Sequence, residues 1–534
     1  MAFCVLILIV TQLCQAFSEN QNVLFIIVDD LRTSLGCYGD KVAHSPNIDL
    51  LAQQSFVFTN AYSQQALCGP SRTSLLTSRS PHHLNQYDVH QYWRLSAGNF
   101  TSLPQYFKES GYRTVSIGKV FHPGKCSNFV DDQPFSWSVQ PFHPKSERFK
   151  NAPVCPSING SGNSMSIVCP VDVQDQPGET LPDLESLGKA EKYLENHVQN
   201  TLEEPFFLAV GFHKPHIPLK FPQEYLSTTL FTLGYSIRKW KKLKHKYHPL
   251  EKMSLPHMKR RPPKLPSSAW NPWLDLRKRD DIRHLNISFP WGEVPNEWAL
   301  RLRQSYYASV TYIDHLIGRL IKKIDELKLK KNTIILLTSD HGWSLGEHGE
   351  WSKYSNYEVS THIPLILSIP GKTGRHIKHL VELLDVFPTL VDTAGIKGGI
   401  PECVNGYTDT FCTDGRSLTP LLDNIKREVL PWRRGAFSQY PRPGDYPVMK
   451  PNSDQPDQQD IKVMGYSVRT SRHRYTEWLL FDPKINKANW TQVYGSELYD
   501  HTIDPEENLN LSDREVLNPL IVSLKEMLYK RWGD

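Results

Sequence analysis

Three short apolar runs, far apart in the chain, constrain the fold more than any other feature. They span residues 22–28, 205–210 and 333–338 and are rich in β-branched and aromatic side chains. Such runs predict strands buried on both faces, as in a parallel sheet covered by helices. Open α/β sheets place their sites at the carboxyl ends of the strands. The polar residues that follow these three runs are Asp29, Asp30, His213, Asp340 and His341.

The rest of the chain fits an α/β fold followed by a smaller α+β unit. Apolar residues three or four apart predict one long helix over 297–327. Beyond about residue 425 the pattern changes to a hairpin with strands at 466–470 and 475–480, and to a closing helix at 516–531. We therefore predict a large mixed, mostly parallel sheet covered by helices, and then a short antiparallel sheet.

Chain length and composition set the domain organisation. A globular chain of 534 residues is expected to contain more than one domain. We expect a large domain over 19–425 and a C-terminal subdomain over 426–534. The apolar segment 1–18 has the length and the small-residue end of a secretory signal peptide, with a buried first strand as the alternative.

Secretion has independent support from possible N-glycosylation sites. An N-x-S/T tripeptide is informative only in a secreted chain. The chain has five: Asn99, Asn159, Asn286, Asn489 and Asn510. No later stretch of about 18 apolar residues occurs, so we predict no membrane anchor.

The cysteines agree with an oxidising compartment. Cys155 with Cys169, and Cys403 with Cys412, form short-range pairs that we predict to be disulfides. Pairing of Cys37 with Cys126 stays open, because it depends on Cα separations that a sequence does not supply.

The charge distribution excludes a globally basic, nucleic-acid-binding surface. The formal net charge is +5, but residues 220–265 alone hold 12 Lys or Arg and 2 Asp or Glu. The remainder of the chain is therefore slightly acidic. The local basic excess needs a separate explanation.

Residues 68–72 read Cys-Gly-Pro-Ser-Arg. This pentapeptide resembles the C-x-P-S-R signature of the type I sulfatases. In that family the formylglycine-generating enzyme oxidises the cysteine during secretion, and the hydrated aldehyde attacks the sulfur of a sulfate ester. A geminal diol can attack with one oxygen and expel sulfate with the other, a release step that a serine nucleophile lacks. The resemblance thus implies formylglycine at Cys68.

Clustered carboxylates at two predicted strand ends suit a hard divalent cation, although an Asp-Asp pair can also be a helix N-cap. Sulfatases pair VDD after the first strand with a late SD motif, and both are present here. By this resemblance, Ca²⁺ would be held by Asp29, Asp30, Cys68, Asp340 and His341. Such a cation would polarise the sulfate ester.

The resemblance covers nearly all of residues 20–530, including GKVFHPG, GFHKPHIP, SDHGWSLGEHGEWSKY and SQYPRP. Most sulfatases have Asn at the position of His341; a histidine there resembles one subgroup of the family. That subgroup has an alkaline-phosphatase-like fold and acts in the lysosome, removing the 2-sulfate from non-reducing-end L-iduronate. Its implied substrates are sulfated glycosaminoglycan oligosaccharides, from heparan sulfate and dermatan sulfate.

The same resemblance implies roles for further residues at matching positions. Residues implied to act on formylglycine, sulfate or the leaving sugar oxygen are Arg72, Lys119, His122, His213 and Lys353. His213 would bind sulfate or protonate the sugar oxygen. Residues implied to line the sugar pocket are Trp343 and Tyr354. Cationic donors at this density are what a transferring sulfuryl group requires.

The chain departs from the family pattern in three places. Ser78 stands where the family has Gly, at some strain if that position has positive φ. The loop at 371–380 is short. Segment 227–246 is inserted; it is a basic strip that gathers glycosaminoglycan, or else a solvated loop or a gene-model artefact such as a retained intron.

Two other functions compete with an iduronate-directed sulfatase. One is a related hydrolase acting on another ester, either a different sulfated sugar or the substrate of an alkaline-phosphatase-fold enzyme. Cys68, in place of Ser or Thr with a two-zinc ligand set, argues against a phosphatase. The other is a catalytically silent glycosaminoglycan-binding protein, which would have lost a nucleophile or metal ligand. The intact set of residues favours catalysis.

Overall fold

The computed structural model describes residues 21–157, 162–200, 204–226, 247–403, 411–423 and 432–533. The predicted signal peptide, Asn159 and the basic segment 227–246 lie outside the described residues.

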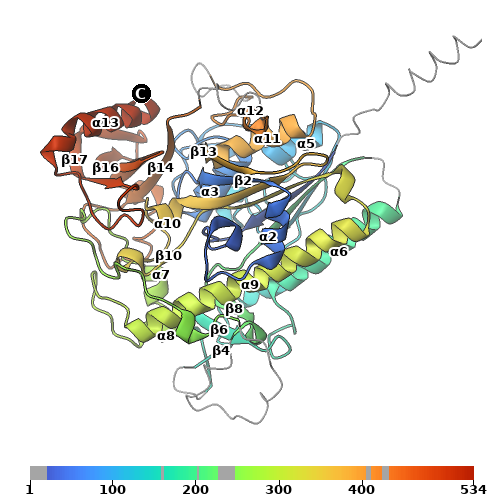
Figure 1. Cartoon of the computed structure of the whole chain (residues 1–534), viewed down its shortest axis with the longest axis horizontal. Helices are drawn as coiled ribbons and strands as arrows, with labels where there is room; N and C mark the ends of the chain where they lie inside the picture. Colours follow the sequence, from blue (N-terminus) through green and yellow to red (C-terminus); the bar gives the residue numbers. More distant parts are fainter. Residues whose placement is uncertain are drawn as a thin grey trace, which may run out of the picture.

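A seven-stranded sheet forms the centre of the molecule (Figure 1), in the order β13-β2-β12-β9-β1-β7-β3. Its strands are β1 Asn22–Val28, β2 Phe56–Tyr62, β3 Arg113–Gly118, β7 Phe206–Phe212, β9 Thr333–Ser339, β12 His362–Ser368 and β13 His376–Glu382. Only β12 runs against its neighbours, and the other six strands share one direction. The mixed, mostly parallel sheet predicted from the apolar runs is confirmed.

Helices cover both faces of this sheet. Alternate residues of β1 belong to separate cores, with Leu24 and Ile26 on one face and Phe25 and Ile27 on the other. The helices of the first core are α2 Pro46–Gln53, α6 Pro182–Gln199 and α9 Asn296–Glu326. Those of the second are α3 Cys68–Thr77, α5 Leu103–Glu109 and α11 Val386–Thr393. Burial on both faces explains why the strand sequences are apolar throughout.

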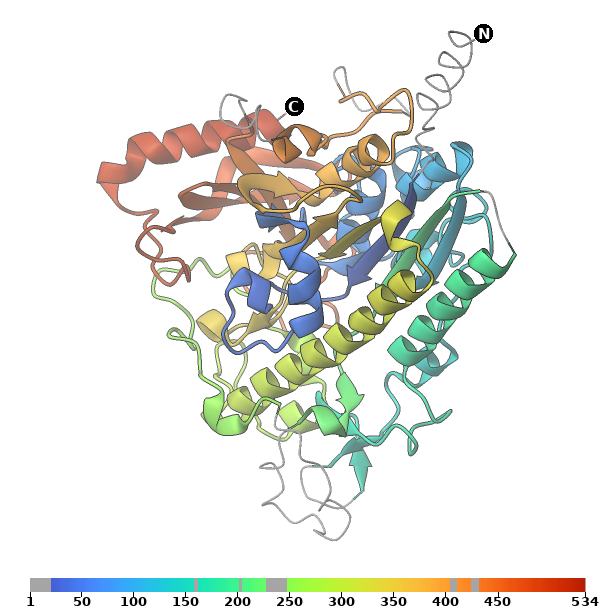
Figure 2. The ribbon, with the colours of Figure 1, turned by 45° about the vertical axis from the view of Figure 1, so that its right-hand side comes forward.

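The two longest helices, α6 and α9, lie side by side (Figure 2). The apolar stripe predicted over 297–327 is buried along α9 from Leu302 to Ile324. At the solvent side, Lys323 pairs with Glu195 of α6 at 2.8 Å. An exposed ion pair of this kind adds little stability. The two helices are therefore held in place mainly by burial of the apolar stripe.

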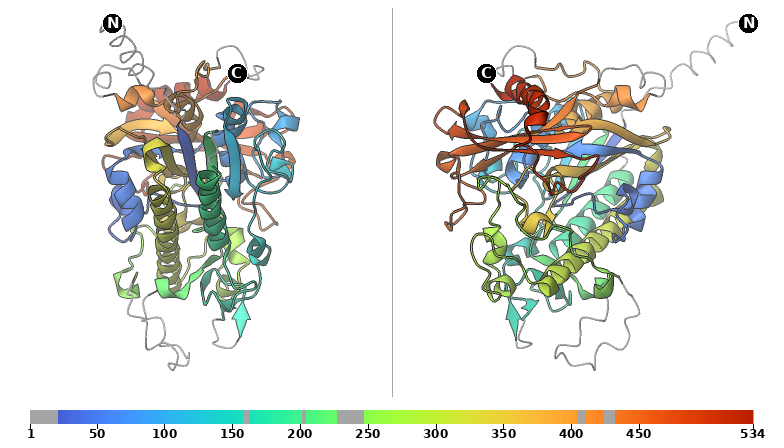
Figure 3. Two further views of the ribbon diagram at one scale, coloured as in Figure 1. Left: turned by 90° about the vertical axis from the view of Figure 1, so that its right-hand side faces the viewer. Right: turned by 60° about the vertical axis from the view of Figure 1, so that its left-hand side comes forward.

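A second sheet, of four antiparallel strands, follows at the C-terminal end (Figure 3). It consists of β14 Gly435–Arg442, β15 Val463–Thr470, β16 His473–Asp482 and β17 Lys487–Asp500, with helix α13 Asn518–Trp532 packed against it. The predicted hairpin and closing helix are confirmed. Two further strands, β14 and the 14-residue β17, flank the predicted hairpin, so the sheet is larger than predicted.

Short elements complete the described part: β4 Cys155–Pro156, β5 Asn163–Ser164, β6 Val168–Val171, β8 Leu219–Pro222, β10 Ser344–Leu345, β11 Trp351–Ser352, α4 Trp93–Ser96, α7 Leu274–Arg277, α8 Asp280–Arg283, α10 Glu358–Thr361 and α12 Thr419–Leu422. Both predicted disulfides, Cys155–Cys169 and Cys403–Cys412, are present, and Cys37, Cys68 and Cys126 are free. Within the described ranges, no helix combines the length and apolarity that a membrane crossing requires.

A buried charge network joins the two sheets. Arg474 of β16 donates to Glu507 at 2.6 Å and to Glu358 of α10 at 2.6 Å. Glu507 also accepts the backbone N–H of Glu358 at 2.7 Å. Burial alone would raise the pKa of Glu507, but Arg474 and His501 outweigh it and lower the pKa to about 2. The network therefore stays ionised at acidic pH.

We predict that Glu507→Gln destabilises the protein by about 3–5 kcal/mol, because it leaves Arg474 buried with one of its two carboxylate partners removed. The lowered pKa of Glu507 contributes stability above its ordinary value of about 4.3, and this contribution is lost as pH falls towards 2. Thermal unfolding at pH 7, 5 and 3 should show the full difference at pH 7 and 5 and a smaller one at pH 3. Glu506→Gln, at a surface pair, is the control and should change little; equal effects of both variants would contradict the network.

Candidate active site

Two strand ends bring the acidic residues together. β1 and β9 pair in parallel with Val28 opposite Ser339, so the residues that follow each strand emerge side by side. The Asp30 backbone N–H donates to Asp340 Oδ1 at 3.1 Å. Asp29, Asp30 and Asp340 are fully buried. The predicted convergence of these carboxylates is therefore what the fold produces.

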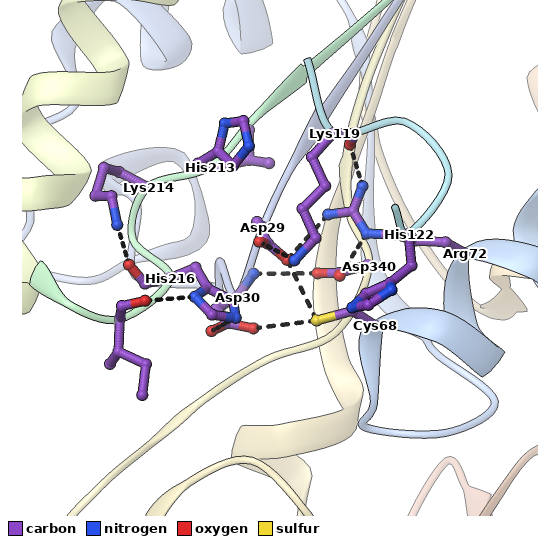
Figure 4. Close-up of polar contacts among 12 residues, drawn as sticks. Asp29, Asp30, Cys68, Arg72, Lys119, His122, His213, Lys214, His216 and Asp340 are labelled. Carbon is purple, nitrogen blue, oxygen red and sulfur yellow. Dashed lines mark hydrogen bonds and ion pairs between the residues drawn. The ribbon is translucent and has the colours of Figure 1, made fainter. Parts of the chain in front are cut away.

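Cys68 lies at the first position of α3 and faces this cluster (Figure 4). Its Sγ is 3.4 Å from Asp29 Oδ1 and 4.0 Å from Asp30 Oδ1. His341 Nε2 lies 3.4 Å from the same sulfur. A thiol on a strand-to-helix turn is thus held against residues that lie 38 or more positions away in the sequence.

Arg72, one helical turn after Cys68, fixes the carboxylates. Its Nε donates to Asp340 Oδ2 at 2.9 Å and its Nη2 to Asp29 Oδ1 at 3.0 Å. Nη1 donates to the carbonyls of Lys119 and Val120. The guanidinium is buried, so its planar fork ties the ends of three strands to α3.

Two lysines complete the polar cluster. Lys119 follows β3, and its Nζ donates to Asp29 Oδ2 at 2.6 Å. Lys353 follows β11, and its Nζ lies 2.8 Å from Asp30 Oδ1 and 3.0 Å from Cys68 Sγ. Lys119 passes so close to β7 that a Cβ on Gly211 would lie 2.0 Å from its carbonyl oxygen. A glycine is therefore required at that point of the neighbouring strand.

The cluster has the chemistry of a cation site. Ligand atoms of Asp29, Asp30 and Asp340 lie within 4.8 Å of one another, as do those of Asp30, Cys68 and His341. Asp30 Oδ2 is buried and has no hydrogen-bond partner among the described residues. Burial, with Asp29 and Asp340 adding to it, raises the pKa of Asp30 to about 7 despite Lys353. These oxygen donors fit a hard divalent cation, which would relieve the crowding of negative charge.

Burial also governs the other titrating groups. It raises the pKa of the Cys68 thiol to about 12, with Asp29 adding to the effect, so an unmodified Cys68 is a poor nucleophile. It lowers the pKa of His341 to about 4, which leaves a neutral imidazole able to act as a ligand.

His216, which the sequence analysis did not select, is the histidine of the GFHKPHIP motif that reaches the cluster. Its Nε2 is 4.0 Å from Asp30 Oδ2, and it groups with Asp29 and Cys68. His213 instead lies 3.3 Å from Asp183 and 3.7 Å from Glu147. His213 directly follows β7, and for that reason sequence reasoning selected it. The second histidine of the H-x-x-H spacing was the available signal.

The remaining predicted site residues lie around the cluster. His122 is partly buried near Lys119 and Arg72, and its Nδ1 is 3.5 Å from Cys126 Sγ. The rings of Trp343 and Tyr354 lie 5.7 and 6.0 Å from Lys353 Nζ. Both rings are almost fully buried, and the Tyr354 hydroxyl donates to Asp275 at 2.9 Å.

Ser78, the departure from the family motif, ends α3 in a left-handed conformation with φ of 53°. Positive φ costs a serine more than a glycine. The hydroxyl compensates in part, because it donates to the Leu384 carbonyl and accepts the N–H of Gly415 at 3.3 Å.

Family comparison matches residues 21–396 to the sulfatase family. The chain belongs to the sulfatase family. A second match, over residues 346–532, is to the C-terminal part of N-sulphoglucosamine sulphohydrolase. This sulfatase is accordingly a sulfuric ester hydrolase, and Cys68 lies in one buried cluster with the three carboxylates, Arg72 and the two lysines.

Similar proteins narrow the relationship. The sulfatase is 44% identical to iduronate 2-sulfatase from Mus musculus, over 95% of this chain and 94% of the relative. It is also 44% identical to iduronate 2-sulfatase from Homo sapiens, over 94% and 95%. Among solved structures, a 2-O GAG sulfatase aligns with a TM-score of 0.65 at 22% identity, covering 97% of this chain and 93% of the other. The predicted sulfatase fold is thereby confirmed.

We predict that His216→Gln lowers kcat of this sulfatase by about 10²-fold or more, the loss typical of a positioned proton-transfer group. His213→Gln should stay within about 10-fold of the parent, because the His213 ring contacts Asp183 and Glu147 rather than the cluster. Steady-state sulfate release from purified variants of equal thermal stability is the measurement. A large loss confined to His213→Gln would restore the role first assigned to that residue.

Proposed function

We propose that this sulfatase removes the 2-sulfate from L-iduronate at the non-reducing end of heparan sulfate and dermatan sulfate oligosaccharides. The observation that carries the proposal is the buried convergence of Cys68 with three carboxylates, Arg72 and two lysines. The sugar comes from the two relatives at 44% identity, both iduronate 2-sulfatases. The fold alone does not select it, because a phosphonate monoester hydrolase from Agrobacterium radiobacter aligns with a TM-score of 0.67.

The proposed chemistry needs two groups that the chain's own residues would carry. Formylglycine made from Cys68 supplies two hydroxyl oxygens once hydrated, one to bond to sulfur and one to expel the sulfate. Ca²⁺ held by Asp29, Asp30, Asp340, His341 and residue 68 supplies positive charge at the sulfate oxygens.

The basic residues would act on the sulfate itself. Lys119 and Lys353 place their ammonium groups on two different carboxylates, those of Asp29 and Asp30, where they can neutralise the sulfuryl oxygens as charge develops. Arg72 would hold the ligands in position, and His122 would contact the nucleophile or sulfate.

His216 would donate the proton to the leaving sugar oxygen. In the free protein, burial and the nearby Lys150 and Lys119 lower its pKa. A bound sulfate ester brings negative charge to the same place and so raises that pKa towards the protonated form. We also propose Trp343 and Tyr354 as residues of the sugar pocket, because their rings lie next to Lys353.

The cellular setting follows from the same proposal. The formylglycine-generating enzyme would act on Cys68 during secretion, and the product would be delivered to the lysosome. The large domain over 19–425 would carry the chemistry, with the subdomain over 426–534 packed against it.

We predict that the secreted protein releases sulfate, at acidic pH, from a heparin disaccharide ending in 2-sulfated iduronate. Cys68→Ala should abolish this release, because no formylglycine can form. Cys37→Ala, at another free cysteine outside the cluster, is the matched control and should keep activity. Turnover by Cys68→Ala would refute the nucleophile, whereas an inactive parent with formylglycine found by mass spectrometry at residue 68 would refute the substrate.

Removal of the proposed cation should reduce both activity and thermal stability. After dialysis against a chelator we expect Tm to fall and to recover on addition of Ca²⁺, because the ion binds only the folded carboxylate cluster. Asp340→Asn should weaken the response to Ca²⁺, while Asp392→Asn, on the surface of α11, should not. A parent protein whose Tm ignores both chelator and Ca²⁺ would contradict the cation site.

A further inference from the structure

A second cavity, lined by both apolar and polar side chains, lies behind the loop that carries His216. It has a volume of about 30 Å³ and is walled by the segments 146–150 and 176–183, by Lys214, Pro218 and Lys220, and by Tyr312 of α9. None of the catalytic carboxylates, nor Cys68, lines it. Figure 4 shows Lys214 beyond His216 as seen from Cys68. The cavity is therefore distinct from the catalytic cluster, although the two share the 213–218 loop.

Three lysines line this cavity, and two of them are deeply buried. Lys214 and Lys220 are 7% and 8% exposed. Among the described residues neither forms an ion pair with a carboxylate: Lys220 Nζ donates to the Phe149 carbonyl at 3.2 Å, and Lys214 Nζ donates to the carbonyls of His216 and Pro218. Burial lowers the pKa of Lys214 to about 8, so it still carries its charge at neutral and acidic pH.

Three further polar groups of the lining lack hydrogen-bond partners within the described part of the chain. They are the Ser146 hydroxyl, the Gln176 carbonyl oxygen and the Tyr312 hydroxyl. All three side chains are at least nine-tenths buried. Burial raises the pKa of Tyr312 well above its ordinary value, so its hydroxyl remains a donor. Buried polar groups are normally paired, and so many unpaired ones around one cavity indicate a polar occupant.

The two carboxylates of the lining do not cancel this basic character. Asp183 accepts hydrogen bonds from the backbone N–H groups of His213 at 2.6 Å and Lys214 at 3.1 Å, so its carboxylate is used to fix the 213–218 loop. Glu147 has a partly exposed side chain, 4.0 Å from Lys150 and 3.7 Å from His213. Both carboxylates act on the charge of Lys214, and Glu147 on that of Lys220, but among the described residues neither forms a direct ion pair with these ammonium groups. Hydroxyl donors beside unpaired ammonium groups are the set that binds a tetrahedral oxyanion.

We propose that this cavity is a second oxyanion site that binds sulfate. Binding of the anion is proposed from the cavity itself. Only the suggestion that the bound sulfate is a reaction product rests on the proposed function. Lys150 lies between the cavity and the catalytic centre, since it lines the cavity and its charge also acts on His216 and His122. Sulfate bound here pairs with Lys214, the residue that holds the His216 carbonyl, and so acts on the loop that carries His216.

Crystals of the full secreted protein soaked in selenate, a sulfate analogue with an anomalous signal, test the site directly. We expect an anomalous peak within hydrogen-bond distance of Lys220 Nζ and the Tyr312 hydroxyl. A peak only at the catalytic cluster, a peak only at surface lysines, or water alone in the cavity would overturn the proposal. Crystals of Cys68→Ala soaked in the intact disaccharide identify the source of the bound anion. Sugar density that leads into the cavity would show that a sulfate group of the substrate binds there. Selenate density without sugar density would show that the free ion binds there.

Binding in solution gives an independent test. By calorimetry with inorganic sulfate, Lys220→Gln should weaken one binding event at least 10-fold, and Tyr312→Phe should weaken the same event if the lysine variant does not fold. Lys192→Gln, at an exposed lysine on α6, is the matched control and should leave both binding events unchanged. Unaltered sulfate binding in both cavity variants would refute the second site. Retained turnover in those variants would leave the proposed function intact whichever way the binding result falls.

Discussion

The balance of buried charge at the end of the central sheet is the constraint on which the rest of the site depends. Three carboxylates, Asp29, Asp30 and Asp340, face three permanent cations, Arg72, Lys119 and Lys353, with almost no solvent between them. Formally the two sets cancel. A divalent cation added to this set makes the site positive, which is the state needed to attract a sulfate monoester. The cluster without a cation is therefore formally neutral, and the same cluster with a divalent cation attracts an anion.

Parallel pairing is what allows so many charges to meet. β1, β9 and β3 deliver their following residues to one edge, and Arg72 reaches all three from α3. The direction of the strands decides this: a reversed strand, such as β12, delivers its following residues to the opposite edge. Residues 310 positions apart can then share a hydrogen bond because the sheet, rather than a loop, fixes their separation.

Sequence reasoning predicted the central strands, the long helix and the carboxylate cluster better than it predicted the remaining residues of the site. The bounds of β1 and the course of α9 followed from apolar patterning, and the carboxylate cluster followed from strand ends. His216 was missed because its approach to Asp30 depends on the path of the 213–218 loop, which periodicity does not encode. The network of Glu507 and Arg474 was missed for a similar reason, since charged residues far apart in the sequence reveal no pairing until the two sheets are packed together.

The C-terminal sheet contributes to the site as well as to stability. Arg442 of β14 is buried and donates to the carbonyl of Tyr354 at 2.7 Å, one residue after Lys353. Asn356 donates to the Gly465 carbonyl of β15 at 3.0 Å. The segment that presents Lys353 to Cys68 is therefore held from the second sheet. A long, flexible lysine side chain loses rotamer entropy when it is fixed among carboxylates. Because Arg442 already anchors the backbone next to Lys353, less additional ordering of this segment is needed when substrate binds. Residues 346–532 match a single C-terminal family unit, which agrees with this physical dependence because the matched range contains both the segment that carries Lys353 and the sheet that holds it.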